Sequence, residues 1–185
     1  REGGKILGQI LKELGEILKP GMSTWDLEKH AEKLFKHYGV KPGFKGYNGY
    51  PAILCTSVNN EVVHGIPNKI PLEKGDILSI DCGVIHKDLN TDSAIAVIVG
   101  GETAPIARRL VDTCIRALWK GIEQVKPGNT VGDIGHAIQK TVEAEGFTII
   151  KELTGHGIGY RLHEEPYIFN YGKKGEGEVL KAGAT

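Results

Sequence analysis

The sequence predicts an α+β fold made of two similar halves, and three observations support this prediction. Four amphipathic helical segments occur in two pairs, and a Lys-Pro-Gly stop signal separates the members of each pair. Two runs with the composition of β-strands, residues 77–85 and 91–99, flank a short polar turn. Two 22-residue segments, one in each half, align with each other without gaps.

Two long helices are predicted by their apolar periodicity. The first covers residues 2–18, and its apolar positions are Ile6, Leu7, Ile10, Leu11, Leu14, Ile17 and Leu18. The other covers residues 102–126, and its apolar positions are Ile106, Leu110, Val111, Cys114, Leu118, Ile122 and Val125.

Each long helix is followed by a shorter helix that has a recognisable start. The segment 24–38 begins at a Ser-Thr pair that supplies the N-cap, and Asp26 and Glu28 lie in its first turn. The segment 131–145 is capped by Thr130. A glycine ends each of the two helices.

An internal repeat relates the two halves, which cover about residues 1–101 and 102–185 of a single domain. KPGMSTWDLEKHAEKLFKHYGV (19–40) and KPGNTVGDIGHAIQKTVEAEGF (126–147) share six of 22 residues. General capping rules would explain part of this likeness, but duplication explains it better. The final LKAGAT aligns with LEKGDI, which precedes Asp81, so the counterpart of Asp81 would fall beyond the last residue. We therefore expect a chain cut at both ends, with the C-terminal strands of the second half missing.

The predicted hairpin carries two aspartates, Asp81 and Asp92, among apolar neighbours. If the turn centres between His86 and Lys87, the two carboxylates face each other across the paired strands. Like charges placed this way repel, and strand interiors disfavour Asp. The pair therefore needs a bound cation or a shared proton.

The composition excludes several classes of protein. Apolar residues make up 40% and charged residues 25% of the chain, and 23 acidic residues balance 23 basic ones. This argues against nucleic acid or a membrane as the main partner, and the apolar runs are too short to cross a bilayer. The three scattered cysteines, Cys55, Cys82 and Cys114, indicate reduced thiols and a cytoplasmic protein.

Three of the seven histidines stand out. His64 precedes a Gly-Ile-Pro turn and is expected at a strand end, while Gly155 and Gly157 flank His156, which indicates a close backbone approach. His163 follows beside two glutamates. The other four have ordinary contexts on predicted helices or in a polar turn: His30, His37, His86 and His136. Two aspartates and one histidine would suit Mn, Fe, Co or Zn.

Three motifs together resemble methionine aminopeptidases of the first type, a family of metallopeptidases. The motifs are GYNGYPAILCTSVNNEVVHGIP (46–67), GDILSIDCG (75–83) with Asp92 eleven residues after Asp81, and GHGIGYRLHEEP (155–166). The likeness runs along the whole chain.

This resemblance implies the "pita-bread" fold, in which two αβ halves are related by a pseudo-twofold axis around curved antiparallel strands. It implies two divalent metal ions (Co, Mn, Fe or Zn) held by Asp81, Asp92, His156 and two glutamates beyond the end of this sequence. It also implies catalytic roles for His64 and His163. The side chains expected to line the substrate pocket are Phe44, Tyr47, Tyr50, Cys55 and Leu162, the last at a position where the family commonly has an aromatic residue.

The implied activity is removal of the initiator methionine from N-terminal methionyl peptides and nascent chains. A cytoplasmic monomer that contacts the ribosome fits this role. With three of five ligands present, the 185-residue chain itself is expected to be inactive or nearly so. Two alternatives are a proline-specific peptidase of the same fold and a non-catalytic binding module.

Overall fold

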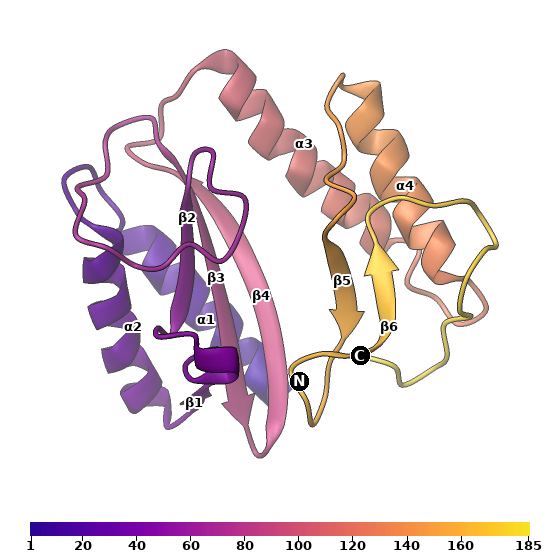
Figure 1. The fold of residues 1–185 in the computed structure, drawn as a ribbon, viewed down its shortest axis with the longest axis horizontal. Coiled ribbons are helices and arrows are strands. Elements are labelled where there is room, and N and C mark those ends of the chain that lie inside the picture. Colours follow the sequence, from indigo (N-terminus) through magenta and orange to yellow (C-terminus); the bar gives the residue numbers. More distant parts are fainter. The chain divides into compact units, whose positions relative to one another are not determined.

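The computed structural model describes all 185 residues, which form two compact units. The first unit contains Arg1–Ala104 and Tyr160–Leu162, and the second contains Pro105–Gly159 and His163–Thr185. Figure 1 shows the elements of both units.

The first unit has two helices and a four-stranded antiparallel sheet (Figure 1). Strand β3 is the centre of this sheet: β4 pairs along one edge, and β1 and β2 share the other edge. The elements are α1 (Glu2–Ile17), α2 (Thr24–Tyr38), β1 (Lys41–Pro42), η1 (Tyr47–Gly49), β2 (Leu54–Val58), β3 (Ile77–His86) and β4 (Leu89–Ile98).

One face of β3 packs into the core, so the residues between the core residues lie on the opposite face of the sheet. Helix α1 lies against β3 and β4. Its apolar side chains are buried in this contact, as expected for an amphipathic helix that packs on a sheet. The core residues of β3 alternate along the strand: Leu78, Ile80, Cys82 and Val84. The intervening residues, among them Asp81 and Gly83, therefore point to the opposite face of the sheet.

The second unit has two helices and a two-stranded antiparallel sheet. The elements are α3 (Pro105–Ile122), α4 (Val131–Ala144), β5 (Thr154–Gly157) and β6 (Glu164–Phe169). Helix α4 packs on α3 and on β6. Gly135 of α4 allows this packing, because a Cβ there would lie 2.4 Å from the carbonyl oxygen of Tyr171.

The predicted helices are present, with differences at their ends. Helix α2 has the predicted bounds, and α1 and α4 each end one residue early. Helix α3 is shorter than predicted at both ends. It starts at Pro105, a residue favoured in the first turn, and the four residues after Ile122 form turns that close the helix.

The repeat found in the sequence is also present in the hydrogen bonding of the two units. Ser23 and Asp26 form a capping box at α2, and Thr130 and Asp133 form the same box at α4. Backbone bonds also recur, with a spacing of 107 residues at the helix starts and 108 residues in the segments that pair with them. Their pairs are Gly21 N–Leu72 O with Gly128 N–Leu180 O, Leu72 N–Met22 O with Leu180 N–Asn129 O, and Trp25 N–Asn68 O with Gly132 N–Glu176 O. The likeness therefore extends beyond general capping rules to the segment that runs beside each helix start.

No helix of the chain is both long enough and apolar enough to span a membrane.

Candidate metal and substrate site

The hairpin of β3 and β4 brings Asp81 and Asp92 together, but not in the predicted register. Asp81 pairs with Ala94, and Asp92 pairs with Gly83. The expectation of directly opposed carboxylates is therefore wrong: the turn is formed by residues 87–88, which moves the pairing by two positions. Since side chains alternate with a period of two, both carboxylates still project from one face as diagonal neighbours.

The two carboxyl groups lie close enough that the charge of Asp92 disfavours ionisation of Asp81. Burial, the charge of Asp92 and a side-chain hydrogen bond with Asp92 together raise the pKa of Asp81 to about 8. A hydrogen bond from the Cys82 backbone amide opposes this rise. A cation placed between the two groups would replace the proton and remove the repulsion.

Cys55 lies beside this pair, because β2 places it directly opposite Asp81 on β3. Its side chain is buried, and burial raises the pKa of the thiol to about 11, so it stays neutral at physiological pH. Burial also raises the pKa of Tyr50 well above its ordinary value. Tyr50 Oη lies 2.9 Å from the carbonyl oxygen of Leu54 and 3.0 Å from that of Gly65. The thiol and the phenol thus form a neutral, half-buried patch next to the carboxylates.

The ring of Phe44 covers Gly83 on the same face of the sheet. A Cβ at Gly83 would lie 2.6 Å from Phe44 Cε1, so only glycine leaves room for the ring. The backbone reinforces this contact, since Gly43 N donates to Gly83 O over 2.8 Å. Because Gly83 pairs with Asp92, the aromatic ring lies close to the carboxylate pair.

The other two predicted pocket residues differ in exposure. Tyr47 is exposed in the short helix η1, whose next residue, Asn48, has a left-handed backbone conformation. Leu162 is buried and belongs to the three-residue segment that joins the first unit, where Asn90 Nδ2 donates to Tyr160 O over 3.1 Å.

His64 lies in the loop after β2 and not at a strand end, so that expectation is wrong. Two hydrogen bonds to residues of β2 hold this loop at Gly65, the residue after His64. Gly65 N donates to Ser57 Oγ over 3.1 Å, and Thr56 N donates to Gly65 O over 2.8 Å. His64 itself has a φ of 59°, which is uncommon for a residue with a side chain. The imidazole is exposed and extends from a well-anchored backbone.

In the second unit, the rings of His156 and His163 lie side by side, with centroids 4.3 Å apart. His156 Nδ1 lies 2.9 Å from Gly157 O, so a proton on Nδ1 would satisfy that carbonyl and leave Nε2 as the ligand atom. The predicted close backbone approach is confirmed at Gly157, where a Cβ would lie 2.3 Å from Glu165 O. A bulge in the β5–β6 ladder falls at this same point.

The three predicted metal ligands belong to two units. Asp81 and Asp92 form their pair in the first unit, and His156 is in the second. The structure contains no group of three or more His, Cys, Asp or Glu side chains that could hold an ion. The chemistry of the donors that are present fits a divalent cation, because two half-buried carboxyl groups lie together on one face of the sheet.

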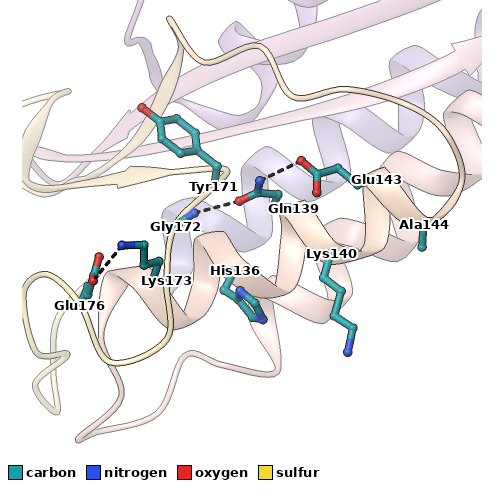
Figure 2. A pocket seen from close by; sticks show the side chains of 9 residues that line it. All are labelled: His136, Gln139, Lys140, Glu143, Ala144, Tyr171, Gly172, Lys173 and Glu176. Atoms are coloured by element: carbon teal, nitrogen blue, oxygen red, sulfur yellow. Dashed lines mark hydrogen bonds and ion pairs between the residues drawn. The ribbon is translucent and has the colours of Figure 1, made fainter.

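An open groove of about 750 Å³ lies elsewhere, between α4 and the segment Tyr171–Glu176 (Figure 2). Gln139 bridges its walls: its side chain donates to Glu143 and accepts a hydrogen bond from Gly172 N (Figure 2). The groove contains none of the predicted site residues.

Comparison with known proteins identifies the family of this chain. The profile of metallopeptidase family M24 matches residues 1–185. The chain belongs to this family. A methionine aminopeptidase of Clostridium acetobutylicum is 43% identical over 184 residues, which cover 99% of the M24 chain and 73% of that relative.

Solved structures agree with this assignment. A crystal structure of methionine aminopeptidase from Rickettsia prowazekii matches the M24 chain with a TM-score of 0.96 at 38% identity, over 99% of this chain and 73% of that one. Prolidase from Pyrococcus furiosus shares the fold, with a TM-score of 0.83 at 23% identity, over 98% of this chain and 51% of that one. The predicted α+β pita-bread fold class is confirmed.

Sequence reasoning missed three residues that shape the site of this M24 chain. Gly83 admits the Phe44 ring, Ser57 anchors the loop after His64, and Glu28 binds the start of β2. The only local signal was glycine in a strand, at Gly83, which often marks a close approach. The other two contacts depend on tertiary structure.

Proposed function

We propose that this protein removes the N-terminal methionine from peptides and nascent proteins by metal-dependent hydrolysis. The observation that carries the proposal is the pair of adjacent carboxyl groups, Asp81 and Asp92, on the sheet face that also bears Cys55 and the Phe44 ring. The likeness to methionine aminopeptidases along 99% of the chain supports the same assignment.

Asp81, Asp92 and His156 are the residues that would hold the metal. Their oxygen and imidazole donors suit Mn, Fe, Co or Zn, and divalent ions held there would balance the negative charge of the two aspartates. When bound, such ions activate water and polarise the scissile carbonyl. Such ions would also attract a free amino terminus, which would restrict cleavage to the first residue.

The remaining residues would bind and orient the substrate. His64 and His163 have imidazole groups suited to hydrogen-bond the scissile amide and the carbonyl that follows it. The pocket for the methionine side chain would be formed by Phe44, Tyr47, Tyr50, Cys55 and Leu162. A neutral thiol and aromatic rings favour an unbranched thioether over a charged side chain, because sulfur makes favourable contacts with ring edges.

Peptide hydrolysis tests the proposal. The protein is assayed at the full length of its relatives, of which this sequence spans about 73%, because the 185-residue chain alone is expected to be nearly inactive. It is supplied in turn with Co²⁺, Mn²⁺, Fe²⁺ or Zn²⁺ and offered Met-Ala-Ser, Lys-Ala-Ser and Gly-Pro. We expect release of methionine from the first peptide only, complete inhibition by a chelator, and loss of activity in Asp81→Asn. The exposed turn variant Asp88→Asn is the matched control and should keep full activity.

Cleavage of Gly-Pro in place of Met-Ala-Ser would replace the proposal with a proline-specific peptidase. Metal binding without hydrolysis of any peptide would point to a binding module and would also refute the proposal.

A further inference from the structure

A buried carboxylate outside the proposed metal site contacts the start of β2. Glu28 lies on α2, and only 2% of its surface is exposed. Its Oε1 accepts a hydrogen bond from Ile53 N over 2.7 Å, and its Oε2 accepts one from Leu54 N over 3.0 Å. A buried acidic side chain needs such partners, and here both are consecutive backbone amides.

These amides immediately precede the pocket residue Cys55. Leu54 begins β2 and pairs with Cys82, which places Cys55 opposite Asp81. Leu54 is held at both of its backbone groups, because its N–H donates to Glu28 and its carbonyl oxygen lies 2.9 Å from Tyr50 Oη. The carboxylate therefore fixes the strand end from which two of the proposed pocket side chains are positioned.

The internal repeat indicates that this contact is not a requirement of the fold. At the spacing of 107 residues that relates the two capping boxes, the counterpart of Glu28 is Gly135. Helix α4 approaches the neighbouring backbone directly at this glycine. The same helix position thus carries a buried charge only in the half that bears Cys55 and the aspartate pair.

We propose that Glu28 is a positioning residue that sets the place of Cys55 and Tyr50, and through them the selectivity for the first side chain of the substrate. This inference rests on the proposed function for its substrate. Its geometric part, the position of Cys55, can be tested without turnover.

The first test measures the reactivity of the Cys55 thiol with a disulfide reagent. A Cys114→Ser background removes the exposed thiol, and Cys82 is fully buried in the core. Glu28→Gln leaves one buried amide without its acceptor and should raise the reaction rate of Cys55 about tenfold, as the strand start opens more often. Glu28→Asp shortens the side chain by one methylene and should raise the reaction rate of Cys55 by a smaller factor. This variant replaces Glu28→Gln in the test if Glu28→Gln does not fold.

Asp26→Asn is the matched control on the same helix. The substitution replaces the carboxylate that accepts from Ser23 N and Ser23 Oγ with a weaker amide acceptor, and residue 26 has no bond to β2. It should lower stability while leaving the Cys55 reaction rate unchanged. If Asp26→Asn accelerates the thiol reaction as much as Glu28→Gln does, or if neither Glu28 variant changes it, the positioning role is refuted.

The second test measures selectivity. The ratio of kcat/KM for Met-Ala-Ser to that for Leu-Ala-Ser should fall about tenfold in Glu28→Gln, mainly through a higher KM for the methionyl peptide, and should be unchanged in Asp26→Asn. An unchanged ratio in Glu28→Gln would overturn the selectivity claim. If the unaltered protein hydrolyses neither peptide, the proposed function fails, while the thiol measurement still decides whether Glu28 positions Cys55.

Discussion

Replacing Asp92 by asparagine should stabilise the metal-free protein at high pH and only at high pH. Burial and the charge of Asp92 raise the pKa of Asp81, so the metal-free pair is expected to hold one proton near neutral pH. Above the pKa of Asp81, about 8, both half-buried groups are charged and repel each other. The substitution keeps the shape of the side chain and removes one of the two charges.

The size of the effect follows from the pKa. A rise from 3.8 to about 8 means that ionising Asp81 costs on the order of 6 kcal/mol more in the folded chain than in the unfolded one. Burial, the largest cause, persists in the variant, so only the contribution of Asp92 is relieved. A nearby like charge typically accounts for about 2 kcal/mol, and we expect a gain of this size in the free energy of unfolding at pH 9.

The two pKa values of Asp81 also determine how the stability of the metal-free protein changes with pH. Because the folded pKa of Asp81 lies above the unfolded one, the folded chain binds more protons between pH 4 and 8. The stability of the metal-free protein therefore falls as the pH rises through this window. At pH 5 the proton is in place, so the Asp92→Asn variant should show little or no gain.

Urea denaturation at pH 5 and pH 9, in the presence of a chelator, measures both values. Asp88→Asn makes the same chemical change in the exposed turn of the same hairpin and should alter neither value. A gain that is equal at the two pH values, or a loss at pH 9, would contradict the reasoning.

Three further predictions concern the supports of the site. Gly83→Ala should force the Phe44 ring away, cost about 1–3 kcal/mol in urea denaturation and raise KM for methionyl peptides; an unchanged KM would refute the ring's role in the pocket. Ser57→Ala removes the acceptor for Gly65 N and should lower kcat about tenfold while metal affinity, measured by calorimetry, stays the same; an equal loss of metal affinity would contradict this. Thr130→Ala should cost about 1 kcal/mol of stability through loss of the capping box, and no change in the urea midpoint would argue against that box.

The parts of the fold that the sequence could predict depend on local rules. Helix α2 has the predicted bounds because Ser23 and Asp26 cap its start and Gly39 closes it in a left-handed conformation. The existence of the hairpin follows from its two runs of strand-forming residues. The repeat was visible because capping residues and stop signals recur at one spacing.

The hairpin register was not predictable from the same signals. Its turn residues, Lys87 and Asp88, both have positive φ, as a tight hairpin turn requires. Neither residue belongs to the Asn-Gly or Asp-Gly pairs that mark such turns in a sequence. The prediction that the two carboxylates lie on one face was still correct, because a shift of two positions returns each side chain to the same face.

The roles of Glu28 and His64 depend on tertiary contacts. The sequence indicates only that Glu28 is a charged residue near the start of a helix. Its role as a buried hydrogen-bond acceptor depends on the contact with residues 53–54, which are distant in the sequence. The sequence predicts a strand end at His64 because apolar residues precede it. In the structure, three hydrogen bonds at Gly65 hold this segment as a loop.

Anomalous diffraction from crystals grown with Mn²⁺ tests the central claim most directly. The account predicts anomalous density about 2.0–2.3 Å from carboxylate oxygens of both Asp81 and Asp92 and from Nε2 of His156, and the loss of this density in Asp81→Asn. Well-ordered crystals with no density near either aspartate, at a pH above 8 where the shared proton is gone, would contradict it.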